Sequence, residues 1–148
     1  MSRKAAPGRQ AGVAAVEFAL VSVLFFAVMI GVVEMGRLLW VWNAAVEGTR
    51  LGARLAVVCD IGDSDIKNRM TERVPELTTS QIDVTYLPAG CNTGNCTEVR
   101  VELINYTYAT LLPHFEIVPQ SIRSIPMPKF GTTLRKEFMQ SAGNPICG

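Results

Sequence analysis

Glu17 is the residue with the clearest potential for chemistry, because it is an ionisable side chain at the edge of an uncharged apolar run. That run, Phe18–Val33 (FALVSVLFFAVMIGVV), contains one hydroxyl group and no charge. A carboxylate in such a place is costly in free energy, and residues of this kind are usually paired or functional. Two interpretations are open: Glu17 binds a partner cation, or its side chain extends to the water at a membrane surface.

The cysteines form the second group with chemical potential. Cys59, Cys91, Cys96 and Cys147 all follow the apolar run, so an anchor in that run places them on its exported side, where disulfides form. The spacing of the middle pair differs from the two-residue spacing of redox and zinc pairs. His114 is the single histidine available to complete a mixed metal site. We therefore expect two disulfides rather than a metal site or free thiols.

The pairing of the four cysteines has three possible forms. We favour Cys91–Cys96, because this six-residue segment contains Gly and Asn and closes easily across the tip of a hairpin. Cys59 and Cys147 then pair by elimination and tie the C-terminal tail to the end of a long N-terminal helix. Pairing of Cys59 with Cys91 or with Cys96 remains the alternative.

No enzymatic motif accompanies these residues. The sequence lacks a glycine-rich phosphate loop, a Gly-x-Ser-x-Gly motif, a His-Glu-x-x-His motif and a paired-carboxylate signature. His114 lies between Pro113 and Phe115, which favours a surface or core-edge histidine over a catalytic base. We expect no enzyme activity, no cofactor and no metal.

Composition divides the chain into two pieces. Of its 148 residues 18% are charged, against about 25% in an average soluble domain. The 14 Lys and Arg against 13 Asp and Glu give a net charge of +1, which argues against a nucleic-acid-binding protein and, with the apolar content, against disorder. Through Val58 there are six basic and three acidic residues, a net of +3; from Cys59 there are eight and ten, a net of −2.

The apolar run is long enough, with its flanks, to anchor the chain in a membrane. Its sixteen residues span roughly 24 Å as a helix, and Val13–Val16 and Met35–Trp42 extend it past the roughly 30 Å of a hydrocarbon core. Trp40 and Trp42 then lie where an interfacial aromatic belt is expected. The residues before the run include three basic ones and no acid, which predicts a cytoplasmic N-terminus: Arg3, Lys4 and Arg9.

Two other interpretations of the run are weaker. A buried core helix does not need sixteen uncharged residues beside a basic leader. A cleaved secretory signal needs a small-x-small site soon after the run, and EMGRLLWVWN contains none.

The residues around Glu17 resemble a known processing site. A basic leader ends in Gly12, and an apolar helix follows with Glu17 at its fifth position and Phe18 at its sixth. This is similar to the prepilin-peptidase site of the type IV pilin superfamily. GVAAVEFALV and EMGRLLWVWNAAVEGTRLGAR together resemble, over about Arg9–Ala56, the start of the TadE-like minor pilins of tight-adherence (Tad, or Flp) pilus systems. The family's Ala-Arg-Glu-Gly-Ala-Arg-like stretch reads VEGTRLGAR here.

The resemblance implies a role for each residue of this site. It implies cleavage between Gly12 and Val13, and recruitment or registration of the subunit by Glu17 and Phe18. Cleavage creates an α-ammonium at Val13, a buried cation for which Glu17 of a neighbouring subunit supplies a carboxylate. The implied partners are a prepilin peptidase, other minor and major pilins, the inner-membrane pilus assembly platform and membrane lipid, with no nucleic acid.

The helical pattern continues past the predicted membrane segment, so one helix is expected over about Val13–Val58. Apolar and small residues recur there at helical spacing: Val41, Ala44, Ala45, Gly48, Leu51, Gly52 and Leu55. The small residues in the middle of this stripe allow another element to approach closely. We expect that element to belong to the chain's own domain rather than to a second membrane helix.

A second, short helix is expected after Cys59. Asp63 or Ser64 caps its start and Pro75 limits its length. Its apolar face is spaced as in a helix: Ile66, Met70, Val74 and Leu77.

Strands are expected in the remainder of the chain. Alternating patterns predict strands at Gln81–Leu87 and at Thr97–Leu103, the second extending as far as Tyr108. Thr132–Phe138 is a candidate third strand. The proline-rich segment Leu112–Lys129 predicts irregular structure.

These observations predict an α+β fold: a long N-terminal helix, partly transmembrane, packed on a small antiparallel sheet with one short extra helix, as in pilins. The expected domains are a basic leader (1–12), a transmembrane helix (13–42), its continuation outside the membrane (43–58) and an exported α+β domain (59–148). The expected location is the inner membrane, in a single pass with the C-terminal domain extracytoplasmic, and incorporation into the pilus is also open.

The expected function is that of a pilin-like structural subunit. A prepilin peptidase processes it, and it acts as a minor pilin or as an assembly or priming component of a Tad-type pilus used in surface adherence. The alternative is an uncleaved single-pass anchor that displays a small extracytoplasmic binding domain.

Overall fold

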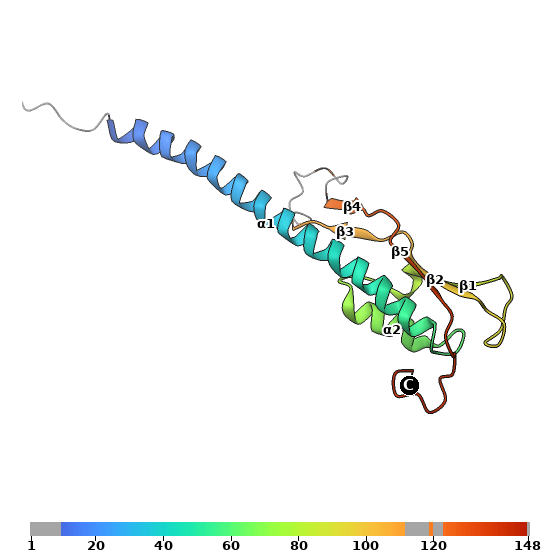
Figure 1. The fold of residues 1–148 in the computed structure, drawn as a ribbon. Helices are drawn as coiled ribbons and strands as arrows, with labels where there is room; N and C mark the ends of the chain where they lie inside the picture. The colour runs from blue at the N-terminus through green and yellow to red at the C-terminus, as the bar shows by residue number, and fades with distance from the viewer. Residues whose placement is uncertain (1–9, 112–118, 120–122, 148) are drawn as a thin grey trace, which may run out of the picture. The chain divides into compact units, whose positions relative to one another are not determined.

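The structure is a computed structural model that describes residues 10–111, 119 and 123–147. The basic residues of the expected leader and His114 lie outside these ranges. The chain forms two compact units, Met1–Arg37 and Leu38–Gly148, which are described separately. Its elements have the α+β character that the sequence predicts (Figure 1).

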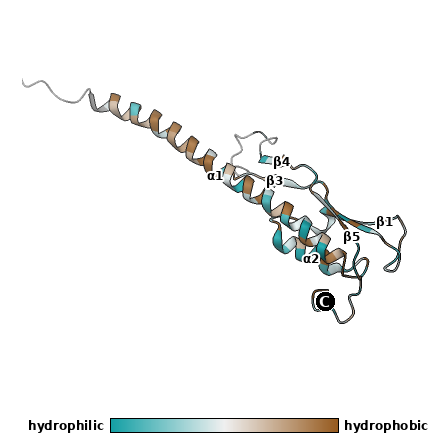
Figure 2. Ribbon diagram, viewed as in Figure 1, coloured by the Kyte–Doolittle hydropathy of each residue, from teal (hydrophilic) through white to brown (hydrophobic). Residues whose placement is uncertain are grey.

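The first unit contains the N-terminal part of α1 (Gln10–Ala56), which starts three residues before the predicted Val13. Its apolar side chains are exposed on every side of the helix between Val13 and Val33, and Figure 2 shows this stretch as almost uniformly hydrophobic. Among the described residues, α1 is the one helix long and apolar enough to cross a membrane. A helix that is apolar all round needs an apolar environment. Near its end, Glu34 and Arg37 form an ion pair of 3.7 Å.

The second unit begins with the last part of α1, from Leu38, and continues into α2 (Ser64–Arg73). Asp63 caps α2 as expected: its Oδ1 accepts a hydrogen bond from the Asp65 N–H at 3.0 Å. The helix ends at Arg73, just before Val74 and Pro75. The face predicted to be apolar is buried: Ile66, Met70, Val74 and Leu77.

Two glycines of α1 form the surface against which α2 packs. A Cβ atom added at Gly48 would lie 2.3 Å from Cγ2 of Val74, and one added at Gly52 would lie 2.2 Å from Sδ of Met70. Both neighbouring side chains are almost completely buried. The stripe of small residues on α1 therefore packs against an element of the chain's own domain, as expected. Glycine has only a hydrogen atom in place of a side chain, which leaves room for Val74 and Met70.

A three-stranded antiparallel sheet follows a 3₁₀ turn (η1, Thr79–Gln81). Its order is β1 (Ile82–Leu87), β2 (Glu98–Leu103) and β5 (Gly131–Arg135). Val84 pairs with Val101, and Val99 pairs with Leu134. The predicted alternation of β2 is confirmed, since its three apolar side chains are buried: Val99, Val101 and Leu103. The third strand is shorter than the predicted Thr132–Phe138 and starts one residue earlier.

Two short strands form a separate antiparallel pair, β3 (Thr107–Ala109) with β4 (Ser124–Pro126). This corrects two predictions. Strand β2 does not extend to Tyr108, because Asn105 adopts a left-handed conformation with φ of 52° and ends it. The segment predicted to be irregular contains β4, which pairs through Ile125 with Tyr108.

The core lies where α1, α2 and the sheet meet, and it joins residues from all three: Val41, Ala45, Ala53, Leu55, Ile66, Met70, Val74, Ile82, Val99, Val101, Leu103, Tyr106 and Tyr108. One polar contact links α1 to β5, the hydroxyl groups of Thr49 and Thr132, which are 3.1 Å apart. The ring of Trp42 packs edge-on against Phe130 with centroids 5.0 Å apart. Trp40 stays 61% exposed.

Replacement of Gly48 by alanine tests the close approach of the two helices. The added methyl group overlaps Val74, and overpacking typically costs about 1–3 kcal/mol, more than the roughly 1 kcal/mol that alanine gains over glycine in a helix. We expect Gly48→Ala to lower the free energy of unfolding by about 1 kcal/mol. Urea unfolding of the protein in detergent, followed by tryptophan fluorescence, measures this change.

Gly36→Ala is the matched control, because nothing lies within 4 Å of a Cβ atom added there. Val74→Ala should cost less in the Gly48→Ala background than in the wild type, since it removes the overlapping methyl groups. Strictly additive effects of the two substitutions would show that the overlap is absent.

Candidate functional site

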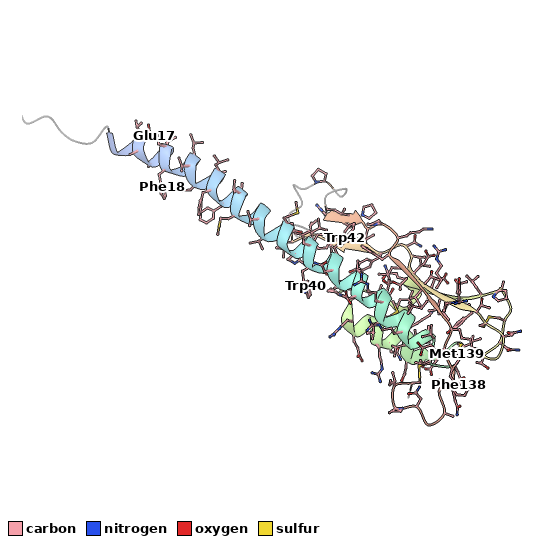
Figure 3. The ribbon with its side chains drawn as sticks, in the orientation of Figure 1. Glu17, Phe18, Trp40, Trp42, Phe138 and Met139 are labelled. Carbon is pink, nitrogen blue, oxygen red and sulfur yellow. A yellow bond between two sulfur atoms is a disulfide. The ribbon has the colours of Figure 1, made fainter. Side chains whose placement is uncertain are left out.

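The predicted processing site lies at the start of α1. Gly12 is the third residue of this helix, and Val13, Glu17 and Phe18 follow on it (Figure 3). Val13 is 60% and Phe18 is 75% exposed, and Glu17 is exposed as well. All four residues are therefore exposed in the structure.

Gly12 has no packing role within the described chain. Nothing lies within 4 Å of a Cβ atom added at this position, and its φ is outside the left-handed range. Glycine in a helix interior costs roughly 1 kcal/mol relative to alanine. A glycine without a conformational or packing reason points to a reason outside the fold, such as the approach of another protein to the backbone.

Val13 and Glu17 are four residues apart and so lie on the same face of α1. The rise between them is about 6 Å along the helix axis. The first N–H groups of a helix lack partners within it and give this end a partial positive charge. Glu17 lies about two turns after Gln10, the first residue of α1, and so beyond the first turn in which the effect of these N–H groups is strongest.

Two disulfides join the cysteines in the second unit. Cys59 and Cys147 are linked with their Cα atoms 5.5 Å apart, and Cys91 and Cys96 with their Cα atoms 5.0 Å apart. These are the pairings favoured from the sequence. A carboxylate oxygen of Asp63 and the sulfurs of Cys59 and Cys147 lie within 4.8 Å of one another, but disulfide sulfurs provide no thiolate for a metal.

The short disulfide closes a loop that the local side chains already shape. The carboxamide oxygen of Asn92 accepts hydrogen bonds from the N–H groups of Gly94 at 2.8 Å and Asn95 at 3.1 Å. In return, Oδ1 of Asn95 accepts from the Asn92 N–H at 2.7 Å. Lys136 donates to the Gly94 carbonyl at 2.9 Å, which ties the loop to the segment after β5.

The long disulfide belongs to a set of contacts between the C-terminal segment and the end of α1, which we name the C-terminal clamp: Val57, Val58, Cys59, Asp60, Asp63, Glu137, Gln140, Ser141 and Cys147. The hydroxyl of Ser141 accepts from the Asp60 N–H at 2.8 Å and donates to Oδ2 of Asp63. The Ser141 N–H donates to Oδ2 of Asp60 at 3.1 Å. Asp63 therefore caps α2 and holds the tail at once.

Sequence reasoning identified Asp63 as a cap but missed Ser141. No local pattern marks this serine, because its partners lie 78 and 81 positions earlier in the chain. The one available signal was Cys147, whose pairing with Cys59 brings the tail beside Asp60 and Asp63.

Burial raises the pKa values of two tyrosine side chains in the domain. Burial, followed by the charge of Glu76, raises the pKa of Tyr106 to about 12, and its hydroxyl donates to the Pro75 carbonyl at 2.7 Å. Burial is also the main cause that raises the pKa of Tyr86, with a smaller effect of the Asp63 charge in the same direction. Neither hydroxyl has the lowered pKa that an activated nucleophile needs.

Removal of each disulfide tests their unequal contributions to stability. The Cys59–Cys147 bond has a sequence separation of 88 residues and the Cys91–Cys96 bond one of 5. In the chain-entropy model these loops contribute about 4.5 and 2 kcal/mol. We expect Cys59→Ser/Cys147→Ser to lower the free energy of unfolding more than the control pair Cys91→Ser/Cys96→Ser, measured by urea unfolding.

Peptide mapping without reductant checks the connectivity in the same preparations. A peptide that links Cys59 to Cys91 or Cys96 would contradict the assignment. Equal losses of stability in the two double variants would contradict the loop-length argument.

Comparison with known proteins relates the helix to one family. Residues 12–54 match the family model described as TadE-like protein; the match begins at Gly12 and ends two residues before the end of α1. No curated protein and no solved structure matches the chain. The family is structural rather than catalytic and is associated with Tad pili. The matched segment holds Gly12, Glu17 and the apolar helix, so this part of the chain is similar to TadE-like proteins, which are associated with Tad pilus systems.

Proposed function

We propose that the chain is a pilin-like structural subunit that a prepilin peptidase processes between Gly12 and Val13. It acts as a minor pilin, or as an assembly or priming component, of a Tad-type pilus used in surface adherence. The observation that carries this proposal is the combination at the start of the TadE-like segment. A glycine without a packing role is followed by an exposed apolar helix with Glu17 one turn past the scissile bond.

The exposure of this helix supports a role in a membrane and then in an assembly. Its apolar side chains have no cover within the described chain between Val13 and Val33. The bilayer covers them in the precursor, and the apolar helices of other pilins cover them after assembly. In this proposal the N-terminus is cytoplasmic, the C-terminal domain is extracytoplasmic, and the pilus assembly platform receives the subunit at the inner membrane.

The charge of Glu17 supports the assignment of the cleavage site. Cleavage before Val13 leaves an α-ammonium at the end of a helix, where it is unfavourable in an apolar environment without a counter-charge. Within one chain, Glu17 is displaced from it by about 6 Å along the axis. A neighbouring helix shifted by that one turn places its own Glu17 level with the new ammonium. The pair thus sets the axial stagger between subunits.

Substitution of the residue before the scissile bond tests the processing step. We expect Gly12→Trp to leave the protein at the mass of the precursor, because a bulky side chain blocks approach of the peptidase to the backbone. The control is Gly36→Trp, another α1 glycine around which nothing lies within 4 Å of an added Cβ atom; it should be processed normally. Intact mass and N-terminal sequencing from membranes with and without the peptidase measure both.

A Gly12→Trp protein with the wild-type mature N-terminus would overturn the processing site. Wild-type protein that keeps its leader in the presence of the peptidase would favour the uncleaved anchor that displays a binding domain.

Removal of the Glu17 charge separates assembly from membrane insertion. A carboxylate deep in a membrane helix costs roughly 2.5–3.5 kcal/mol on insertion scales, so Glu17→Ala and the isosteric Glu17→Gln should insert at least as well as the wild type. We expect both variants to lose co-purification with other pilins and to reduce piliation. Carbonate extraction of membranes checks insertion.

Glu47→Gln is the matched control, because it removes another exposed carboxylate from α1, in the part proposed to lie outside the membrane, where Glu47 forms a surface ion pair with Arg50. Unchanged piliation in the Glu17 variants would reduce Glu17 to a side chain that extends to the membrane surface.

A further inference from the structure

An apolar groove opens on the second unit beside the end of α1. It has a volume of about 690 Å³, and α1, β5 and the C-terminal segment supply its walls. Its apolar lining is Leu51, Leu55, Val57, Val58, Leu134 and Ile146. Ile146 is 49% exposed although it lies in this lining, so the groove is open to solvent.

A protruding aromatic side chain follows one residue of the groove wall in the chain. Phe138 is 78% exposed and directly follows Glu137, a residue of the groove wall. Figure 3 places it in the C-terminal segment, at the end of this unit away from Trp40 and Trp42. The backbone around it is fixed, because the N–H groups of Glu137 and Gln140 donate to the carbonyls of Val57 and Val58 at 3.3 and 2.9 Å. Met139, the next residue, is buried.

A fixed phenylalanine in water is unfavourable in a folded protein. Burial of such a side chain stabilises by roughly 1.5–3 kcal/mol. The C-terminal clamp holds Phe138 outward in spite of this gain. Phe138 is not part of the lining of the groove in its own chain, so a groove on another molecule is its natural acceptor.

The rim of the groove carries charges of both signs. Arg54, Arg135 and Glu137 line it, and none of the three takes part in the ion pairs found among the described residues. This surface combines an exposed phenylalanine, an apolar groove, one carboxylate and two guanidinium groups, so it is complementary to a second copy of itself. Two-fold symmetry is the arrangement that brings such a surface against a second copy of itself.

We propose that this face is an interface between two copies of the chain. Phe138 of each copy enters the groove of the other, and Glu137 of each copy pairs with Arg54 or Arg135 of the other. The interface lies entirely within the second unit and does not require the processing proposed above.

Photo-cross-linking from position 138 tests the proposal in the full chain in its membrane. With p-benzoylphenylalanine in place of Phe138, we expect a cross-linked product of two copies. Mass spectrometry should place the attachment in the groove, on peptides that contain Val57, Leu134 or Ile146. The same probe in place of Ile61, an exposed residue outside the groove lining, is the control and should give no such product.

The outcomes of this experiment separate cleanly. Attachment to a different protein, attachment outside the groove or no product at position 138 would overturn the proposal. The same two-copy product is expected in the unprocessed Gly12→Trp variant, so failure of the processing site and failure of this interface give different results.

Reversal of the rim charges provides a second, independent measurement. Glu137→Arg should lower the yield of the two-copy product at least tenfold, because it faces two arginines across the interface. Glu137→Arg combined with Arg54→Glu and Arg135→Glu should restore it, since the same pairs then form with opposite sense. Glu72→Arg, the same charge change at an exposed position of α2 outside the groove, should change nothing. Equal effects of Glu137→Arg and Glu72→Arg would overturn the pairing.

Discussion

The close approach of α2 to α1 is the constraint on which the rest of the domain depends. Gly48 and Gly52 allow Val74 and Met70 to enter space that any other side chain would fill. With α2 held at this distance, its apolar face and that of α1 form one layer that covers one face of the sheet. The three buried side chains of β2 complete this core. A larger residue at Gly48 would overlap Val74, and one at Gly52 would displace the Met70 side chain, because packed interiors leave few voids.

The two units differ in the exposure of the apolar side chains of α1. In the second unit the apolar residues of α1 face its own domain, and the charged residues Glu47, Arg50 and Arg54 face outward. In the first unit every face of the same helix is apolar and exposed. The change occurs within one continuous helix, so no turn or linker marks it in the backbone. What changes is the cover of the apolar side chains, which the chain's own domain supplies in the second unit and no described residue supplies in the first.

Much of this structure could be predicted from the sequence where the signal was local. The stripe of small residues, the Asp63 cap, Pro75 and the alternation around Val101 each act within a few residues, and each indicated the correct element. Strands β3 and β4 were missed because three residues are too short for a period-two pattern, and a proline closes β4. No sequence pattern around Asn105 predicted its left-handed backbone conformation. Ser141 and the apolar groove depend on contacts across the whole domain, so no window of sequence contains them. The roles proposed for Gly12 and Glu17 lie in contacts between molecules, which neither the sequence pattern nor the fold of one chain displays.

The bond between Cys59 and Cys147 makes the domain a covalent ring attached to α1. Nearly all of the residues after α1 lie between Cys59 and Cys147. A protease that cuts one peptide bond between Cys59 and Cys147 therefore releases nothing, because both pieces stay attached to α1. A domain built in this way keeps its parts together after a single cleavage.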